Sequence, residues 1–389
     1  MEFVRMGIIG VGNMGSGHLS NIVGGKCPEI KVTAVCDINP DRLAWAREKA
    51  GPDIACFENA IEMLDSGLID ACIIAVPHYS HPMYVIECLK RDIHVMCEKP
   101  AGVYTKAVRA MNEAAAHSKA KFGMMFNQRT DCIYRKMREI VQSGKMGRIR
   151  RTNWIITNWY RPQAYYDSGA WRATWSGEGG GVLLNQCPHN LDLWQWICGM
   201  PKTVTAHLYY GKWHDIEVED DVTAFVEYEN GATGCFITTT GDAPGTNRFE
   251  ITLDGGKLLA ENGKLYMTEL EMFEPEFSRT NKISFAGPRG NTFEVETDGQ
   301  SPQHVGVLNR FAAAILRDEP LVARGEEGIF GLTISNAMHL SSWLGKTVEI
   351  PFDEDLFYDE LMKRVATSRR KEPVAGTVAD LSGTYNTGK

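Results

Sequence analysis

The stretch Ile8-Ile9-Gly10-Val11-Gly12-Asn13-Met14-Gly15 decides how the first part of the chain folds. It completes a short apolar run over residues 4–9 and opens a segment with helical periodicity over residues 13–23. In such a strand–turn–helix unit, the first glycine permits a tight turn, the second lets a phosphate approach the backbone, and the third lets the helix pack on the strand. We therefore predict a dinucleotide site whose contacts come from Gly10, Gly12, Asn13, Met14 and Gly15.

An acidic residue stands at the end of the second predicted strand. Asp37 follows the run over residues 31–36, at the spacing from the glycines that allows hydrogen bonds to the adenosine ribose. Its charge would repel a 2′-phosphate, so we expect NAD as the cofactor, with Ile38 beside it. Arg42 keeps NADP open as a minority alternative, because a nearby arginine can accommodate that phosphate.

Short β-branched runs alternate with helical patterns through the first 126 residues, which is typical of a parallel sheet covered by crossover helices. Strands are predicted over residues 4–9, 31–36, 69–76, 93–98 and 121–126, and helices over residues 13–23, 40–49, 82–90 and 104–117. We expect an α/β fold that begins with a doubly wound Rossmann domain over residues 1–126.

From Asn153 onward the pattern changes to longer alternating strands joined by hairpin signals such as Glu229-Asn230-Gly231. We expect an α+β domain over residues 127–350, with a large, mostly antiparallel open sheet that binds substrate and carries the oligomer contacts. Helical segments over residues 303–317 and 326–344 offer apolar faces that can pack on either domain. Residues 351–389 are expected to form a C-terminal helix and a loose tail.

The composition limits the classes of function. With 389 residues, 43% of them apolar and 23% charged, the chain resembles a globular protein of two domains. A net charge of −8 without a basic stripe excludes a nucleic-acid partner. The apolar runs are shorter than the roughly 20 residues that span a bilayer, and no signal peptide is evident, so we expect a cytoplasmic protein without a membrane partner. The ten cysteines form no CxxC pair, which predicts reduced thiols. His81, Cys187 and His189 could suggest a zinc site, but their spacing is not that of zinc ligands, so we expect no metal.

Polar residues follow two further predicted strands. The first stretch is Ala75-Val76-Pro77-His78-Tyr79-Ser80-His81, and the second is Cys97-Glu98-Lys99-Pro100. In an open parallel sheet, ligands lie beyond the carboxyl ends of the strands, so both stretches face the cofactor crevice. Contacts with the cofactor are expected from Ala75, Val76, Pro77, His78, His81, Glu98 and Lys99. The Lys99-Pro100 bond is a candidate for the cis form, which would aim the lysine.

The run Gly179-Gly180-Gly181-Val182-Leu183-Leu184-Asn185-Gln186-Cys187-Pro188-His189-Asn190-Leu191-Asp192 carries the remaining candidates. In a helix, Asn185, His189 and Asp192 would share one face. Pro188 lacks a backbone N–H, so it either kinks this helix or marks its true start. In both cases we expect Asn185 and His189 to point into the site.

Taken in order, these motifs resemble those of the Gfo/Idh/MocA oxidoreductases, the relatives of glucose-fructose oxidoreductase and inositol dehydrogenase. The resemblance extends from the first strand to about residue 350 and implies hydride transfer with NAD. It also implies that Lys99 and His189 flank the reacting carbinol, with an aspartate usual at the position of Asn185. Asparagine can orient a hydroxyl or His189 but cannot accept a proton. His189 is therefore expected to do most of the acid–base work, while Lys99 holds the carbinol oxygen.

The segment from Asn153 to Trp175 is rich in tryptophan, tyrosine and arginine, whose faces and polar tips suit a sugar ring. Contacts with the substrate are expected from Lys99, Tyr160, Arg172, Asn185 and His189. Beyond the last Rossmann strand, Asn127 is expected beside the cofactor. Arg129 either contacts a ligand or pairs with a carboxylate.

Together these residues favour an NAD-dependent dehydrogenase that oxidises a secondary ring hydroxyl of a sugar, glycoside or cyclic polyol. The asparagine form of the third motif is similar to a glycoside-handling branch of the family, so C3 of a glucoside is the position we expect. Two alternatives remain open: a redox-neutral glycoside-modifying enzyme with tightly bound NAD, and a non-catalytic NAD-bound sensor. We expect a homo-oligomer, because one face of the second sheet lacks helices to cover it.

Overall fold

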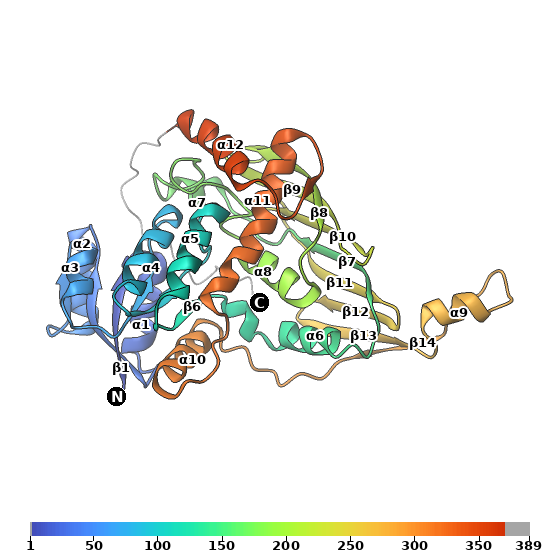
Figure 1. Ribbon diagram of the computed structural model, residues 1–389, viewed down its shortest axis with the longest axis horizontal. Helices are drawn as coiled ribbons and strands as arrows, with labels where there is room; N and C mark the ends of the chain where they lie inside the picture. Colours follow the sequence, from blue (N-terminus) through green and yellow to red (C-terminus); the bar gives the residue numbers. More distant parts are fainter. Residues whose placement is uncertain (1, 370–389) are drawn as a thin grey trace.

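The computed structural model describes residues 2–369. Its N-terminal part is a six-stranded parallel sheet in the order β3-β2-β1-β4-β5-β6, flanked by helices (Figure 1). The strands are β1 (Val4–Ile9), β2 (Ile30–Cys36), β3 (Ala55–Phe57), β4 (Ala71–Ile74), β5 (His94–Cys97) and β6 (Phe122–Met124). The helices between them are α1 (Asn13–Val23), α2 (Pro40–Ala50), α3 (Ala60–Asp65), α4 (His81–Leu89) and α5 (Thr105–Ala116). This order confirms the predicted Rossmann arrangement and places its switch point between β1 and β4.

Two short elements, β3 and α3, were not predicted from the sequence. β3 has three residues, all half-buried, because it forms the edge of the sheet. α3 has six residues, too few to display helical periodicity. Its start does carry a signal, since Asn59 caps it by accepting a hydrogen bond from the N–H of Ile61 at 2.8 Å. The other helices and strands of this part lie close to their predicted bounds.

The C-terminal part is built on a nine-stranded sheet in the order β14-β13-β12-β11-β7-β10-β9-β8-β15. Its strands are β7 (Ile149–Ile156), β8 (Thr203–Tyr210), β9 (Glu219–Glu227), β10 (Thr233–Thr239), β11 (Asn247–Leu253), β12 (Gly256–Glu261), β13 (Lys264–Leu270), β14 (Gly290–Glu294) and β15 (Val348–Glu349). β7 and β10 pair in parallel, and the other neighbours pair antiparallel, as predicted. Strands β13 and β14, with helix α9 (Glu274–Thr280) between them, project beyond the rest of the sheet (Figure 1).

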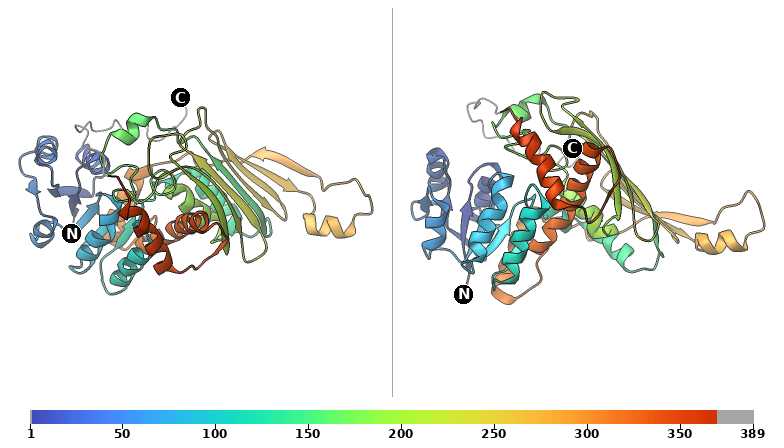
Figure 2. Two further views of the ribbon diagram at one scale, coloured as in Figure 1. Left: turned by 90° about the horizontal axis from the view of Figure 1, so that it is seen from above. Right: turned by 45° about the horizontal axis from the view of Figure 1, so that its top comes forward.

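Helices cover one face of this sheet, and no helix of the described residues covers the other (Figure 2). The covering helices are α6 (Cys132–Gln142), α8 (Pro188–Cys198) and α11 (Gly328–Leu344). Beneath them, Trp154 stacks on Phe249 with ring centroids 4.2 Å apart, and Trp194 stacks on Phe236 at 5.4 Å. Each aromatic pair contributes about 0.5–1.5 kcal/mol beyond the burial of its area. Because Trp194 belongs to α8, this packing fixes α8 against the sheet.

The last helices join the two parts of the molecule. Helix α10 (Gln303–Arg317) returns to the Rossmann sheet, where its buried Leu308 and Phe311 enter the apolar cluster around Met6. Helix α12 (Glu354–Ala366) packs beside α5, and Arg109 of α5 pairs with Glu354 at 2.6 Å. Two helices that follow the large sheet in the sequence therefore pack against the N-terminal part.

Helix α12 is the expected C-terminal helix, whereas the expected tail lies, from residue 370 onward, outside the described residues. The proposed domain boundaries at residues 126 and 350 stay predictions. Within residues 2–369, each helix is too short or too polar to cross a lipid bilayer.

Candidate active site

The glycine-rich turn between β1 and α1 has the shape that the sequence predicts. Gly10 has a φ of +89°, and a Cβ there would overlap the carbonyl oxygen of Ala75. A Cβ on Gly15 would overlap the carbonyl oxygen of Gly10, so only glycine lets α1 pack this closely. A Cβ on Gly12 would meet nothing within 4 Å. Two of the glycines therefore close the turn, and Gly12 leaves its surface open.

This open surface lies at the N-terminus of α1, where no side chain caps the first turn. The backbone N–H groups of a helix start lack intrahelical partners, and the helix dipole favours negative charge there. The glycine turn therefore fits the pyrophosphate of a dinucleotide, with Asn13 and Met14 beside it in the first turn of α1.

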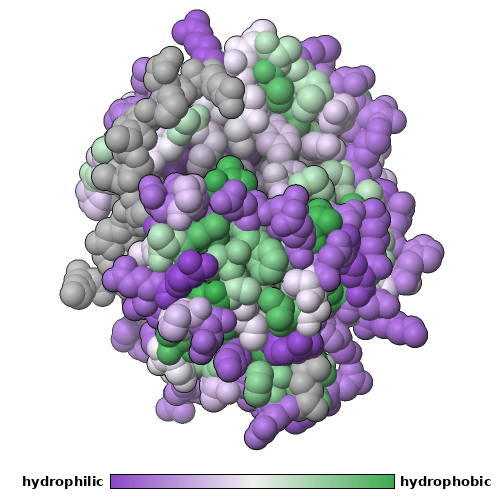
Figure 3. All heavy atoms as spheres, turned by 90° about the vertical axis from the view of Figure 1, so that its left-hand side faces the viewer, coloured by the Kyte–Doolittle hydropathy of each residue, from purple (hydrophilic) through white to green (hydrophobic). Residues whose placement is uncertain are grey.

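Figure 3 views the molecule from the side of α2 and α3, where hydrophobic residues gather in the middle of a mostly hydrophilic face.

Asp37 lies at the carboxyl end of β2, next to the open turn. Its Oδ2 accepts a hydrogen bond from the N–H of Val11 at 2.7 Å, and its Oδ1 accepts one from the N–H of Asn39 at 2.9 Å. Each carboxylate oxygen has a second lone pair, which remains for a ribose hydroxyl. Arg42 donates from Nε to the Val11 carbonyl at 2.7 Å and keeps Nη2 without a partner among the described residues. Ile38 is 91% exposed at the same edge.

The ends of β4 and β5 meet at this edge of the sheet. The Lys99–Pro100 peptide bond is cis. Beneath it lies the buried ring of His81, with one nitrogen 2.6 Å from the Pro100 carbonyl oxygen and the other 2.7 Å from that of Val76. Both ring nitrogens thus face the backbone, and the expected contact of His81 with the cofactor stays a prediction. Its place is a supporting one, between the β4 turn and the lysine turn.

Glu98 belongs to a buried polar cluster that the sequence did not reveal. Its Oε1 lies 2.7 Å from Nε2 of His18 on α1, and its Oε2 accepts the N–H of Lys99 at 3.1 Å. Burial opposes the charge of Glu98, but the hydrogen bond and charge of His18 outweigh it and lower the pKa of Glu98 to about 2. His304, at the start of α10, meets His18 edge-on with ring centroids 5.6 Å apart. Three distant segments therefore converge beside Lys99.

The run Gly179-Gly180-Gly181 forms a second glycine turn. Gly179 has a φ of +84°, and a Cβ there would overlap Val103. A Cβ on Gly181 would overlap the carbonyl oxygen of Glu219. The buried carboxylate of Glu219 also accepts the N–H groups of Gly181 at 2.9 Å and Leu183 at 3.0 Å. Protein atoms thus occupy the space around these glycines, and these contacts fix the backbone conformation of the turn.

The segment that follows this glycine turn ends at Pro188, where helix α8 begins. The expectation that Pro188 marks the true start of the helix is confirmed, because proline at the first helical position loses no hydrogen bond. Asn185 lies in the turn before the helix, and His189 lies in its first turn. The two side chains therefore reach the site from a turn and a helix, not from one helix face.

Lys99, Asn185 and His189 come together as the motifs predict. Lys99 donates from Nζ to the backbone oxygen of Asn185 at 2.8 Å, which leaves two ammonium hydrogens for a ligand. His189 is 3% exposed, and neither ring nitrogen has a partner among the described residues. Burial lowers the pKa of His189 well below its usual value, and the charge of Lys99 lowers it further. Burial also lowers the pKa of Lys99, while the charges of Glu98 and Glu178 raise it.

Glu178 is a further residue that the sequence analysis missed. Its side chain is buried, its Oε1 accepts the Nδ2–H of Asn185, and its Oε2 accepts the N–H of Ala173 at 2.6 Å. Burial raises the pKa of Glu178, which the nearby charge of Arg172 opposes. A carboxylate thus lies directly behind the asparagine of the third motif.

Comparison with known sequences decides the family of this chain. Residues 4–126 match the oxidoreductase family with an NAD-binding Rossmann fold, and residues 134–259 match the GFO/IDH/MocA C-terminal domain. The chain belongs to the Gfo/Idh/MocA family. It is therefore an oxidoreductase with an NAD-binding Rossmann domain, which confirms the predicted family, fold, cofactor and class of enzyme.

Relatives of this Gfo/Idh/MocA oxidoreductase cover most of its length. The myo-inositol 2-dehydrogenase of Thermotoga maritima is 24% identical over 342 residues, which are 86% of this chain and 95% of that protein. The WlbA dehydrogenase from Bordetella pertussis, solved with NADH and UDP-GlcNAcA, is 23% identical with a TM-score of 0.74, covering 90% of this chain and 100% of that one. A levoglucosan dehydrogenase, solved with NADH and levoglucosan, is 19% identical with a TM-score of 0.74, covering 90% of this chain and 99% of that one. At these identities, the solved structures establish the fold alone.

The aromatic segment of this Gfo/Idh/MocA chain places Arg172 near the site. Its guanidinium lies 4.6 Å from the ring centroids of Tyr165 and Trp171, and its Nη1 donates to the Tyr165 hydroxyl at 2.9 Å. His78 is buried edge-on to Trp171 at 5.8 Å, so its ring faces this segment. Tyr160 is 46% exposed, and no hydrogen bond within residues 2–369 joins its side chain to the site. Arg172 therefore stays a substrate candidate on geometry, whereas Tyr160 gains no support.

Arg129 pairs with carboxylates, the second of the two roles expected for it. The buried guanidinium donates to Asp192 at 2.6 and 2.7 Å and to Glu327 at 2.5 Å. Asn127 is buried and donates from Nδ2 to the side chain of Gln303 at 2.6 Å. Its Oδ1 has no partner among the described residues, so its contact with the cofactor stays a prediction.

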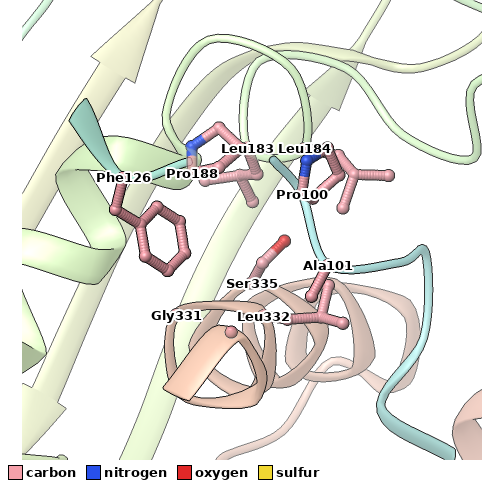
Figure 4. Close-up of a pocket in the computed structure, with 10 residues that line it drawn as sticks. Pro100, Ala101, Phe126, Leu183, Leu184, Pro188, Gly331, Leu332 and Ser335 are labelled. Atoms are coloured by element: carbon pink, nitrogen blue, oxygen red, sulfur yellow. The ribbon is translucent and has the colours of Figure 1, made fainter. Parts of the chain in front are cut away.

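A small pocket lies behind the lysine turn and the start of α8 (Figure 4). Its volume is about 10 Å³, which is room for one water molecule. The walls are mostly apolar, and the hydroxyl of Ser335 points into the pocket (Figure 4). A pocket of this size admits no sugar, so it belongs to the packing behind the site.

Proposed function

We propose that this oxidoreductase removes a hydride from a secondary ring hydroxyl of a sugar, glycoside or cyclic polyol, with C3 of a glucoside as the reacting position. The observation that carries the proposal is the pairing of Lys99 with His189. An ammonium with two uncommitted hydrogens lies near a buried imidazole whose nitrogens have no partner among the described residues. The pair supplies a donor for the carbinol oxygen and an acceptor for its proton.

Each residue has a separate task in this reaction. Lys99 donates a hydrogen bond to the carbinol oxygen and stabilises the negative charge that develops there. His189 accepts the proton, since its lowered pKa keeps the imidazole neutral at neutral pH. Bound NAD, held by the Gly12 turn and Asp37, supplies the acceptor for the hydride.

A neutral ring fits the surroundings of this pair better than a carboxylic acid. Recognition of a carboxylate favours an arginine with a free, bidentate fork. The fork of Arg172 instead lies over two aromatic rings and already donates to the hydroxyl of Tyr165. Aromatic faces and amide groups suit the C–H and hydroxyl surfaces of a ring. The names of an inositol dehydrogenase and a levoglucosan dehydrogenase among the relatives support the same class.

The test is incubation of the protein with NAD and, separately, glucose, a methyl glucoside and myo-inositol. We expect NADH to form and NMR to show a ring ketone at C3 of the glucoside. Oxidation only at an anomeric carbon would contradict the proposal. Failure to release NADH with any of the three would favour the sensor, and conversion of a glycoside without added NAD would favour the redox-neutral enzyme.

We also propose that the chain forms a homo-oligomer through the bare face of its large sheet. Ile155, Tyr209 and Phe225 lie on that face and are 36%, 51% and 42% exposed. Apolar groups gathered on one surface are typical of protein interfaces. Sedimentation at micromolar concentration should give a species heavier than the 43.3 kDa chain, and a monomer alone would contradict the proposal.

A further inference from the structure

Glu178 is an unusual residue for the place it occupies. Its carboxyl group is buried, with 2% of the residue exposed, and none of its hydrogen bonds within residues 2–369 comes from a lysine or arginine. A buried carboxylate is costly unless its oxygens are satisfied. Here one oxygen accepts a backbone N–H, that of Ala173, and the other accepts the amide of Asn185. The hydrogen bond from Asn185 is therefore one of the two that satisfy the Glu178 carboxylate within the described residues.

The same contact fixes the orientation of Asn185. A carboxylate accepts hydrogen bonds and donates none, so only the Nδ2 end of the amide can face Glu178. The Oδ1 end must then point the other way, and no group of the described residues donates to it. Asn185 is only half-buried, and its backbone oxygen receives the hydrogen bond from Lys99. Its Oδ1 is thus an uncommitted acceptor at the edge of the Lys99–His189 pair.

We propose that Glu178 is a positioning residue that holds the Asn185 side chain with Oδ1 toward the substrate, where it accepts a hydrogen bond from a ring hydroxyl adjacent to the reacting carbinol. This inference rests on the proposed function. It adds that the substrate is a vicinal diol whose neighbouring hydroxyl is recognised as a donor. A ring with the same size but no hydrogen on that neighbour leaves Oδ1 without its partner.

Substitutions at the two positions separate this role from mere packing. In E178Q, the glutamine oxygen accepts the N–H of Ala173, so its amide nitrogen faces the Nδ2 of Asn185. Two donors cannot bond, and Asn185 turns its own nitrogen toward the substrate. In the double variant E178Q/N185D, the glutamine nitrogen instead donates to the new carboxylate at position 185, which again presents an oxygen to the substrate. The matched control is E217Q, which neutralises a carboxylate that contacts the same segment at Trp175 N but not Asn185.

The probes are methyl glucoside and its 2-deoxy-2-fluoro and 4-deoxy-4-fluoro analogues. Fluorine keeps the size of the hydroxyl but cannot donate, so the wild type should prefer the hydroxyl at one of the two positions by about 10- to 100-fold in kcat/KM, the scale of an acceptor left unpaired. In E178Q the preference should fall below that of the wild type, because the Asn185 nitrogen then donates to the hydroxyl oxygen and no carbonyl oxygen is left unpaired by fluorine. In E178Q/N185D the preference should return, while E217Q keeps the wild-type ratio. The electronic effect of fluorine on the carbinol is common to all variants and cancels when their ratios are compared. An E178Q ratio equal to that of the wild type would overturn the proposal.

A second measurement does not depend on turnover. N185D alone brings two carboxyl groups into contact, which raises the pKa of one of them above its unfolded value. A raised carboxyl pKa stabilises the fold at low pH and loses that contribution as the pH rises. The melting temperature of N185D should therefore fall with rising pH relative to the wild type, and E178Q/N185D should remove this difference. Identical pH curves for N185D and wild type would show that Glu178 does not hold position 185, whatever the substrate. If no polyol yields NADH, the proposed function fails together with the substrate part of this inference, and the melting curves still decide the pairing.

Discussion

The two glycine-rich turns, one around Gly12 and one around Gly181, look alike in sequence but have different roles in the structure. A Cβ on Gly12 would meet nothing within 4 Å, whereas a Cβ on Gly181 would overlap the backbone of Glu219. The first turn leaves its space to a ligand, and the second gives its space to the protein so that Asn185 and His189 reach Lys99. Glycine marks a close approach in both places. Which group makes that approach depends on the tertiary structure.

The largest effect should come from the side chains that the closed turn brings together. Lys99→Ala and His189→Ala should each lower turnover by roughly 10² or more, because each removes an acid–base or charge-stabilising group. Neither residue lies in the open turn, so the affinity for NAD should stay close to that of the wild type. NADH formation and a titration of cofactor by tryptophan fluorescence measure the two quantities. Lys106→Ala, which removes a surface lysine of α5, is the control, and near-normal turnover of either variant would refute its assigned role.

Alanine in each turn tests the comparison directly. Gly181→Ala places a methyl group against the backbone of Glu219 and should lower the free energy of unfolding by about 1–3 kcal/mol, the usual cost of overpacking. Gly12 has a negative φ of −70°, and a Cβ there meets nothing within 4 Å, so Gly12→Ala should cost less stability than Gly181→Ala and should lose affinity for NAD. Urea unfolding and cofactor titration of both variants measure the effects. The reverse pattern would show that the two turns have been assigned the wrong way round.

A smaller effect is expected beside the open turn. The wild type should bind NAD more tightly than NADP, because the predicted role of Asp37 is to accept a hydrogen bond from the ribose diol, and its charge would repel a 2′-phosphate. Asp37→Ser should weaken the binding of NAD by about tenfold, which is the scale of one charged hydrogen bond. It should also narrow the difference in affinity between NAD and NADP. Titration of both cofactors against both proteins measures this. Equal or tighter binding of NADP by the wild type would contradict the assignment.

The smallest effect concerns pH. The proposed reaction needs neutral His189, whose pKa lies below the ordinary 6.5, so kcat/KM should show no acid limb at 6.5 and should fall only at lower pH. It also needs protonated Lys99, whose lowered pKa places the alkaline limb below 10.5. NAD affinity should be flatter across the neutral range, because the open turn binds through backbone N–H groups that do not titrate. An acid limb at or above 6.5 would show that another group carries the proton.

The open turn could be predicted almost completely from the sequence. Gly10, Gly12, Gly15 and Asp37 have fixed spacings within one strand–turn–helix–strand unit, and the physics that selects them is local. The helices and strands of the first part were predicted for the same reason. The elements that escaped, β3 and α3, are too short for a periodic pattern to appear.

The rest of the site depends on contacts between distant segments, which spacing does not reveal. Glu178 and His18 are far apart in the sequence, yet both lie against residues of the motifs. His18 did leave one signal, because it falls on the buried face of α1 with Gly15 and Leu19, where apolar residues are the rule. The only sign of Glu178 in the sequence is its position directly before three glycines. The sequence also does not show that the ring nitrogens of His81 lie against the carbonyl oxygens of Pro100 and Val76.

The return of α10 to the Rossmann sheet sets an order of events when the chain is made. The first 126 residues leave the ribosome long before Leu308 and Phe311, which complete the apolar cluster around Met6. His304, beside His18 and Glu98, arrives with the same helix. The nucleotide-binding part thus lacks the helix that covers this apolar cluster until about four-fifths of the protein has been synthesised. A nascent chain halted at residue 126 would therefore present chaperones with a hydrophobic surface.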